Sequence, residues 1–282
     1  MMATRMDGLA VANEVKREVI SDVNDLKARG ITPCLATILV GDDPASAVYV
    51  RNKHMACAQC GIQTKDHKIS AEVTQEQLED IIKDVNNNDK IHGILVQMPL
   101  PDHINTNDII SKISSKKDVD GLTPHSAGLL AAGRARLVAC TPIGIMRMLD
   151  HYNINIEGKH VVIINRSVLV GKPLYHLFLQ KNATVTTCHS KTQNIKKICS
   201  LADIIITGVG NLDKFMLTAD MIKDNAVVID VAINRIDGKL TGDADYNDII
   251  QKASHVTPVP GGVGPMTVAM LLKNTVVAAK YA

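Results

Sequence analysis

Aromatic side chains are scarce in this sequence of 282 residues, which contains no Trp, two Phe and five Tyr. The core must therefore be built mainly from Ile, Val, Leu, Ala and Met. Basic residues form no long run and are not interleaved with aromatic residues, and the net charge is only +2. Because nucleic-acid-binding surfaces concentrate positive charge, we expect no nucleic-acid partner.

Long apolar stretches are also missing. The sequence has no run of about 18 apolar residues, the length that a transmembrane helix requires. Residues 1–7 lead into an amphipathic segment without the continuous apolar core of a signal peptide. We therefore expect a cytoplasmic protein with no membrane partner.

The six Cys residues are scattered and suggest no disulfide framework. We expect reduced thiols, as is usual in the cytosol. Cys57 and Cys60 form a single C-x-x-C pair, whereas a zinc site needs a second pair or nearby His at ligand spacing. We interpret them as helix residues one turn apart and expect no metal.

The patterns that are present alternate between helix and strand along the chain. Apolar residues make up 46% of the sequence and charged residues 21%, which is ordinary for a globular protein of one large or two smaller domains. The alternation predicts an α/β fold with parallel sheets and right-handed crossovers. The predicted strands are 34–40, 62–69, 91–97, 161–165, 183–188, 202–207 and 226–230, and the clearest predicted helices are 9–26, 74–85, 106–113, 174–180 and 266–281.

The helix expected after Pro44 carries the first hint of chemistry. Ser46, Tyr49 and Lys53 follow one another at spacings of three and four, which places a hydroxyl, a phenol and an amine on one helix face. Such a face is either a set of acid/base groups or an ordinary polar face whose Tyr covers a core edge. These residues alone favour the ordinary interpretation.

Further polar residues follow the predicted strands. Gln97 ends the strand 91–97, and Asp118 and Asp120 come after the next helix. Ligands of parallel sheets bind beyond the carboxyl ends of the strands. An amide, two carboxylates, an amine and a phenol gathered there would suit binding of a polar heterocycle and proton transfer to it.

The second half contains the parts of a dinucleotide-phosphate site. The strand 161–165 runs into a polar turn, Gly171 and the start of a helix, where backbone N–H groups and the positive helix end can face phosphates. Asn165 stands where the first Gly of G-x-G-x-x-G is expected. Asn tolerates a positive φ better than most residues, so we expect the turn to form.

The next strand, 183–188, indicates which dinucleotide is bound. An NAD site places Asp or Glu after this strand to hold the ribose 2′-hydroxyl. Here the strand is followed by His189-Ser-Lys-Thr192 and no acid. Arg166, Ser190 and Lys191 offer positive charge and hydrogen-bond donors, which favours a 2′-phosphate and hence NADP.

A Tyr-x-x-x-Lys pair beside a nucleotide fold also occurs in short-chain dehydrogenases. In that family the pair follows the glycine-rich turn within the same domain. Here Tyr49 and Lys53 lie far upstream of Arg166. The order excludes that family unless the chain were permuted.

Taken together, the motifs resemble the bifunctional methylenetetrahydrofolate dehydrogenase–methenyltetrahydrofolate cyclohydrolase family of FolD type over nearly the whole chain. The departure is Asn165, where that family usually has Gly. The matching stretches are Ser46-x-x-Tyr49-x-x-x-Lys53, Val96-Gln-Met-Pro-Leu-Pro101, Lys117-Asp-Val-Asp-Gly121, Cys140-Thr-Pro142, Arg166-Ser-x-x-Val-Gly-x-Pro173, 183–192 and Thr257-Pro-Val-Pro-Gly-Gly-Val-Gly-Pro-Met-Thr267.

The resemblance implies two reactions on tetrahydrofolate one-carbon derivatives. NADP-dependent oxidation converts 5,10-methylenetetrahydrofolate to the methenyl cation, and hydrolysis then gives 10-formyltetrahydrofolate. Lys53 would activate water or move protons, Gln97 would hydrogen-bond that amine, and Asp120 would accept from the pterin. Tyr49 would stack on the aminobenzoyl ring and orient Lys53. Asp118 would be a structural turn residue. The implied substrate-binding residues are Ser46, Tyr49, Asp120, Pro260, Gly261 and Gly262, and the implied cofactor-binding residues are Asn165, Arg166, Ser167, Gly171, Ser190, Thr207 and Ile233.

The family fold has two α/β domains with the active site in the cleft between them. We expect a folate-binding catalytic domain over 1–141, completed by a returning helix over 266–282, and a Rossmann-like NADP-binding domain over 142–265. A homodimer is also implied. Two alternatives stay open, namely a monofunctional NADP-dependent dehydrogenase and a non-catalytic folate or nucleotide sensor.

Overall fold

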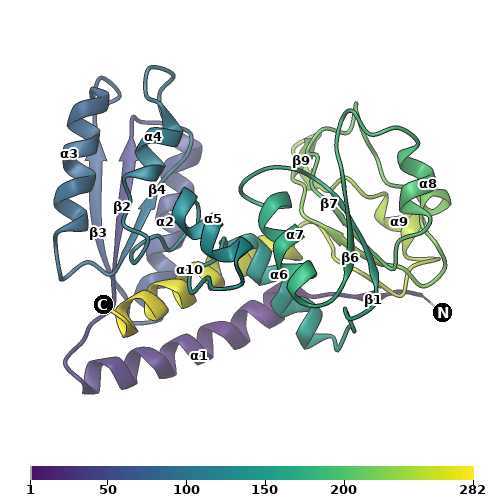
Figure 1. The fold of residues 1–282 in the computed structure, drawn as a ribbon, viewed down its shortest axis with the longest axis horizontal. Helices are drawn as coiled ribbons and strands as arrows, with labels where there is room; N and C mark the ends of the chain where they lie inside the picture. Colours follow the sequence, from purple (N-terminus) through teal and green to yellow (C-terminus); the bar gives the residue numbers. More distant parts are fainter. Residues whose placement is uncertain (1) are drawn as a thin grey trace. The chain divides into compact units, whose positions relative to one another are not determined.

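The computed structural model describes residues 2–282, and the chain divides into two compact units. Unit 1 comprises Met1–Ala12 and Thr141–Thr267, and unit 2 comprises Asn13–Cys140 and Val268–Ala282. Each unit is an α/β structure built on a parallel sheet, as the alternating sequence pattern predicts (Figure 1).

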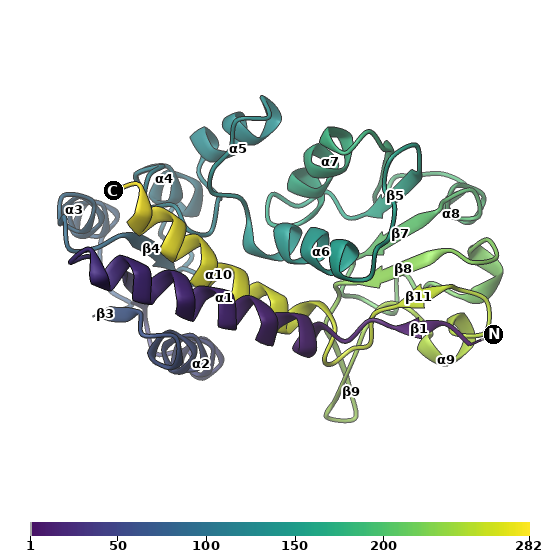
Figure 2. The same ribbon diagram turned by 90° about the horizontal axis from the view of Figure 1, so that it is seen from below.

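Unit 2 contains a sheet in the order β3-β2-β4 within the described residues, with all pairs parallel. Figure 2 shows α3 and α4 on one face of this sheet and α2 on the other. The elements of this part of the chain are α1 (Gly8–Ala28), β2 (Cys34–Val40), α2 (Pro44–Gln59), β3 (Gln63–Ile69), α3 (Gln75–Asn86), β4 (Gly93–Val96), α4 (Thr106–Ser111) and α5 (Pro124–Ala131).

The core of unit 2 is aliphatic, as the shortage of aromatic residues requires. Ile38 of β2, Leu78 and Ile82 of α3, and Ile109 of α4 are fully buried in one cluster. Because β2 is covered on both faces, its seven residues are all buried, which explains the unbroken apolar run in the sequence.

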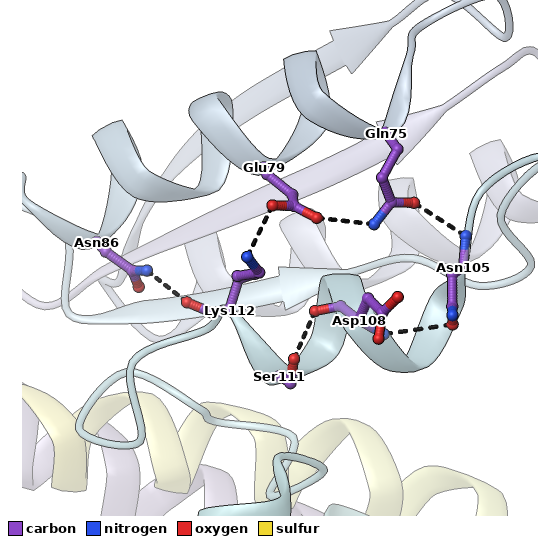
Figure 3. A network of polar contacts seen from close by, with 7 residues as sticks. All are labelled: Gln75, Glu79, Asn86, Asn105, Asp108, Ser111 and Lys112. Carbon is purple, nitrogen blue, oxygen red and sulfur yellow. Dashed lines mark hydrogen bonds and ion pairs between the residues drawn. The ribbon is translucent and has the colours of Figure 1, made fainter.

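Polar contacts fasten α3 to α4 along the rim of this core, and Figure 3 shows them. Lys112 forms an ion pair with Glu79 at 2.8 Å, and Gln75 donates to the same carboxylate at 2.9 Å. Asn86 donates to the carbonyl of Lys112 at 2.7 Å. These contacts fix the segment that leads into Asp118 and Asp120.

Unit 1 contains, among the described residues, six parallel strands in the order β1-β11-β8-β7-β5-β6. A separate antiparallel hairpin, β9–β10, follows β8. The elements are β1 (Thr4–Arg5), α6 (Cys140–His151), β5 (His160–Ile164), α7 (Gly171–Gln180), β6 (Thr184–Cys188), α8 (Ile195–Cys199), β7 (Ile204–Thr207), the 3₁₀ helix η1 (Ala219–Met221), β8 (Val227–Asp230), β9 (Asn234–Ile236), β10 (Lys239–Thr241), α9 (Tyr246–Ile249) and β11 (His255–Val256). The last helix, α10 (Val263–Lys280), starts in unit 1 and belongs to unit 2 from Val268 onward.

Helices cover both faces of the six-stranded sheet. One face packs on Cys199 of α8, Met221 of η1 and Ile249 of α9. In Figure 2, α6 and α7 lie on the opposite face from α9. The sheet is therefore doubly wound, the architecture in which ligands bind at the carboxyl ends of the strands.

The predicted elements are found within a few residues of their expected bounds. Asp7 caps α1 by accepting from Leu9 N–H at 2.9 Å and Ala10 N–H at 3.1 Å, and Thr74 and Gln77 form the predicted capping box. Elements that the sequence analysis did not anticipate are β1, α5, α6, α8, η1, α9, β11 and the β9–β10 hairpin. In the part of the chain that the structure describes, no helix combines the length and apolarity needed to cross a membrane.

Candidate active site

Helix α2 presents Lys53 towards the interior of unit 2. Asp43 caps the helix by accepting from the Ser46 N–H at 2.8 Å, and Pro44 occupies its first turn. Ser46 is buried, Lys53 is half-buried, and Tyr49 is 56% exposed. The predicted polar face is therefore graded, with Ser46 covered, Lys53 at an intermediate depth and Tyr49 presenting its ring to solvent.

The amine of Lys53 meets Gln97, which directly follows β4. Lys53 Nζ donates to Gln97 Oε1 at 3.1 Å, and Gln97 Nε2 donates to the carbonyl of Met98 at 2.8 Å. The second bond fixes the carboxamide so that its oxygen faces the amine. Since the amide carries no net charge, it orients Lys53 without acting as a counter-ion.

Asp120 belongs to the same group of side chains. Burial raises the pKa of its carboxyl group, while the nearby charge of Lys53 and a hydrogen bond from Cys140 lower that pKa in part. Cys140 itself is buried, with its sulfur 3.3 Å from the carbonyl oxygen of Val119, and burial raises the pKa of this thiol. Lys53, Gln97 and Asp120 thus form one electrostatically coupled cluster.

Asp118 has the structural role that its sequence context suggested. Its carboxylate accepts from the N–H of Leu122 at 3.1 Å, the N–H of Thr123 at 2.8 Å and the hydroxyl of Ser126 at 2.7 Å. These bonds satisfy a side chain that is 1% exposed and fold the turn before α5. The prediction that Asp118 is a turn residue is confirmed.

The turn after β5 is organised by the side chain of Asn165. Asn165 Oδ1 accepts from Ser167 N–H at 2.8 Å and Gly171 N–H at 3.0 Å, and its Nδ2 donates to the carbonyl of Gly208 at 2.6 Å. Asn165 is not among the residues with positive φ. The Gly-to-Asn departure is therefore accommodated by side-chain hydrogen bonds instead of by a left-handed backbone.

The same turn differs from an open cradle of backbone N–H groups. The N–H groups of Ser167 and Gly171 bond to Asn165, and Val170 N–H donates to Ser167 Oγ at 3.1 Å. Gly171 must lack a side chain, because a Cβ there would lie 2.1 Å from the carbonyl oxygen of Asn165. The exposed Arg166 guanidinium and the Ser167 hydroxyl proton are donors that can face a phosphate.

The end of β6 lies beside the end of β5. Ile164 and Cys188 are register partners in the parallel pair, so the turns that follow them start from the same sheet edge. His189 N–H donates to Thr192 Oγ1 at 2.8 Å, which folds the turn that exposes Ser190 and Lys191. Positive charge and hydroxyl donors therefore gather at this edge.

Thr207 and Ile233 lie at the carboxyl ends of β7 and β8, respectively. Thr207 ends β7 and is fully buried, with its hydroxyl donating to Asp243 at 2.8 Å. Ile233 follows β8 and is 57% exposed. Two buried carboxylates, Asp230 and Asp243, were not predicted as site residues from the sequence. Asp230 could have been found, because it is a carboxylate that ends an apolar strand. Asp243 lies in a polar segment with no distinguishing pattern.

The residues 260–262 form a turn in unit 1. The Val259–Pro260 peptide is cis, Gly261 has φ +96°, and a Cβ on Gly262 would lie 2.4 Å from the carbonyl oxygen of Pro258. Both glycines are thus required by the backbone. Gly261 also accepts from Gly8 N–H at 3.0 Å, which fastens this turn to the start of α1.

Within residues 2–282, no group of three or more His, Cys, Asp or Glu side chains is arranged to hold a metal ion. The Cys residues of this described part are buried free thiols. Cys57 lies on α2 and Cys60 is its C-cap, as expected for residues one helical turn apart.

Comparison with known proteins assigns both halves of the chain to one family. A family model for the catalytic domain of tetrahydrofolate dehydrogenase/cyclohydrolase matches residues 6–120, and the model for its NAD(P)-binding domain matches residues 139–282. The bifunctional protein FolD of Nitrosopumilus maritimus (strain SCM1) is 63% identical over 279 residues, which span 99% of this chain and 97% of that protein.

Solved structures agree over the full length. The bifunctional FolD methylenetetrahydrofolate dehydrogenase/cyclohydrolase from Campylobacter jejuni superposes with a TM-score of 0.96 at 45% identity, covering 99% of each chain. The Trypanosoma brucei enzyme, crystallised with NADP cofactor and an inhibitor, gives a TM-score of 0.93 at 37% identity over 100% of this chain and 98% of that one. The chain belongs to the tetrahydrofolate dehydrogenase/cyclohydrolase family.

Proposed function

We propose that this protein oxidises 5,10-methylenetetrahydrofolate with NADP and hydrolyses the resulting 5,10-methenyltetrahydrofolate to 10-formyltetrahydrofolate. The observation that carries this proposal is the cluster of Lys53, Gln97 and Asp120, in which an amine faces a neutral amide at 3.1 Å beside a half-buried carboxyl group. Family membership and the bifunctional relatives support the pair of reactions.

The residues at the edge of the six-stranded sheet fit a 2′-phosphorylated dinucleotide. Arg166, Ser167, Ser190 and Lys191 supply two cations and two hydroxyl groups after β5 and β6, and the turn 189–192 contains no carboxylate. Arg166, Ser190 and Lys191 would hold the ribose 2′-phosphate, while Ser167 would donate to a phosphate that NAD and NADP share. When bound, NADP supplies the acceptor for the hydride.

The oxidation needs positioning more than proton transfer. The lone pair of a folate nitrogen expels the hydride, so the protein must hold the methylene carbon in place and tolerate the positive charge that develops. Tyr49 is exposed on α2 one turn before Lys53, where its ring can stack on the aminobenzoyl group. Asp120 can accept hydrogen bonds from the pterin and offset the cationic product.

The hydrolysis needs proton management, which the amine of Lys53 can supply. Water adds to the cationic carbon, and a proton must leave the attacking water before the ring opens. Gln97 holds the amine at 3.1 Å without neutralising it. A carboxylate at that position would favour the ammonium form, which cannot accept the proton. The neutral amide therefore orients Lys53 without adding a counter-charge.

We extend the proposal to the domains and the cellular setting. Unit 2 would bind folate through Ser46, Tyr49 and Asp120, and unit 1 would bind NADP. The protein would act in the cytoplasm as a homodimer, without nucleic acid or membrane partners. Size-exclusion chromatography with light scattering would test the dimer directly.

One preparation of the purified protein tests the activities. Mixed with 5,10-methylenetetrahydrofolate and NADP, it should form reduced cofactor without accumulating the methenyl chromophore. It should also consume added 5,10-methenyltetrahydrofolate faster than buffer does. Cofactor reduction with stoichiometric build-up of methenyl product would instead indicate a monofunctional dehydrogenase, and ligand binding without turnover would indicate a sensor.

A further inference from the structure

We propose that Asp243 is a positioning residue for hydride transfer, because its carboxylate holds the loop after β7 in the shape that receives the nicotinamide half of the cofactor. The inference rests on the proposed NADP-dependent oxidation and adds a residue that lies outside the motifs of the family resemblance. It concerns the loop 207–210, whose conformation is set by groups distant in sequence.

The sheet order places this loop at a ligand site. In unit 1 the chain runs from β5 outward to β6 and then returns to β7 on the other side of β5. The direction of winding reverses between β5 and β7, and doubly wound sheets bind their ligands in the crevice at that reversal. One side of the reversal carries Asn165, and the other carries Thr207 and the loop 208–210. Since Ser190 and Lys191, two of the proposed 2′-phosphate donors, lie after β6, the nicotinamide half belongs on the β7 side.

Asp243 holds the β7 side through three short contacts. Its carboxylate accepts from Val209 N–H at 2.6 Å, Thr207 Oγ1 at 2.8 Å and Gly210 N–H at 3.0 Å. Asn234 Nδ2 adds a fourth bond at 3.2 Å. Asp243 is 0% exposed, so these donors replace water around a buried carboxylate.

Asn165 holds the same loop from the opposite side of the reversal. Its Nδ2 donates to the carbonyl of Gly208 at 2.6 Å, and a Cβ on Gly208 would lie 3.3 Å from that nitrogen. The loop is therefore fixed through its carbonyl by Asn165 and through its N–H groups by Asp243. Two side chains from other segments, Asn165 and Asp243, therefore hold consecutive backbone groups of residues 208–210 by hydrogen bonds.

The segment around Asp243 also reaches the next strand. Asp230, at the end of β8, accepts from Ala232 N–H at 3.0 Å and Ala244 N–H at 2.8 Å. A Cβ on Gly242 would lie 1.9 Å from the Asp230 carboxylate, so Gly at that position permits the close approach. Residues 242–244 thus tie the loop after β7 to the loop after β8, and Asp243 occupies the centre of this connection.

Replacing Asp243 by Asn tests the proposal. An amide has one acceptor oxygen and turns its NH₂ group towards at least one of the backbone donors, so the loop loses part of its support. Hydrogen bonds to a charged group contribute about 1.5–3 kcal/mol, so the kcat/KM for NADP reduction should fall roughly 10- to 100-fold. Hydrolysis of added 5,10-methenyltetrahydrofolate needs no cofactor and should stay within about twofold of wild type.

Two readouts separate positioning from a general loss of structure. Adenosine 2′,5′-bisphosphate carries the adenosine 2′-phosphate portion of the cofactor and lacks nicotinamide, so its affinity should be unchanged in Asp243→Asn. The matched control is Asp245→Asn, which alters a half-buried carboxylate two residues away that caps α9. That control should leave both activities at wild-type levels.

A double-mutant cycle tests whether Asp243 and Asn165 act on the same loop. Asn165→Gly removes the bond to Gly208. In the double variant, the change in free energy for NADP reduction should differ clearly from the sum of the changes in the two single variants, because groups that support the same loop are not additive. If Asp243→Asn fails to fold, Asn234→Ala provides a milder change, since it removes only the 3.2 Å bond to Asp243 and the 3.0 Å bond to Gly242. It should lower NADP reduction and spare hydrolysis.

The outcomes distinguish the two levels of the argument. Wild-type protein that reduces no NADP would overturn the proposed function. If the wild-type protein turns over, two results for Asp243→Asn would overturn the positioning role alone. One is unchanged NADP reduction. The other is an equal loss of both activities and of bisphosphate binding.

Discussion

Replacement of Gln97 by Glu should separate the two proposed activities. The amide oxygen of Gln97 lies 3.1 Å from the amine of Lys53. Glu is nearly isosteric and would place a negative charge at this position. The carboxylate would hold Lys53 in its ammonium form, which cannot accept a proton from water.

The size of the effect follows from the distance and the exposure of the pair. Two unit charges about 4 Å apart interact by roughly 1 kcal/mol in water and roughly 4 kcal/mol at the effective dielectric near a protein surface. Lys53 is half-buried, so the result should lie between these limits. At about 1.4 kcal/mol per factor of ten, an interaction of this size should lower hydrolysis about 5- to 1,000-fold.

Hydride removal should respond in the opposite sense. It needs no neutral amine, and it generates positive charge on the substrate that an added carboxylate stabilises. We therefore expect NADP reduction by Gln97→Glu to be equal to or faster than that of wild type. Methenyl product should accumulate, because its hydrolysis is slowed.

The rates of hydride transfer and of hydrolysis can be measured on one preparation, by following cofactor reduction and methenyl consumption in separate assays. The control is Gln63→Glu, which makes the same charge change at an exposed position at the start of β3. Hydrolysis by Gln97→Glu at the wild-type rate, or loss of both activities to the same extent, would refute the role of the neutral amide beside Lys53.

Three further predictions follow from the same structure. Lys53→Met should lower hydrolysis at least about 100-fold, as expected for loss of a general base, while hydride transfer survives. The control is Arg51→Met, which removes an exposed cation from the same helix. Equal losses of hydrolysis in the two variants would exclude a special role for Lys53. Arg166→Ala should raise the KM for NADP roughly tenfold or more and leave NAD nearly unaffected, because a guanidinium–phosphate contact is lost; an equal change for both cofactors would refute the 2′-phosphate assignment. Burial raises the pKa of Asp230 to about 6 from 3.8, so the folded protein binds an extra proton between those values and loses stability as pH rises through that window. Urea unfolding of wild type against Asp230→Asn at both ends of the window should show a larger decrease for wild type, by up to about 3 kcal/mol, and parallel curves would contradict this assignment.

Local signals account for the elements that the sequence predicted well. Thr74 and Gln77 form a capping box within four residues, and Asp7 caps α1 within three. Continuous apolar runs predicted β2 and β5 because strands buried on both faces carry such runs. These features depend on neighbours in the chain and can be interpreted without the fold.

Elements that depend on distant partners were missed. β1 consists of Thr4 and Arg5, and it exists only because they pair with His255 and Val256 at the other end of the sequence. Two residues carry no periodicity of their own. The β9–β10 hairpin is different, since its turn contains Asp237-Gly238 with φ values of 47° and 78°, a dipeptide typical of tight hairpins that could have been used.

The candidate site shows the same division. Lys53, Gln97 and Asp120 were predicted from strand ends and motif spacing, and the parallel pairing of β2 with β4 helps bring the first two together. The role of Asn165 could not be anticipated, because its side chain bonds across to Gly208 at the end of another strand. Asp243 likewise acts on a loop that is remote in sequence, so only the fold reveals its partners.

The central claim is that one chain carries a single carbon through oxidation and hydrolysis. The most direct test supplies 5,10-methylenetetrahydrofolate with an isotopic label on the methylene carbon, together with NADP, and follows that carbon by NMR in the presence of the wild-type protein. The account predicts that the labelled carbon appears as the formyl group of 10-formyltetrahydrofolate while an equivalent amount of NADP is reduced. The account would be contradicted if the labelled carbon accumulated as 5,10-methenyltetrahydrofolate and this compound were lost no faster than in buffer alone.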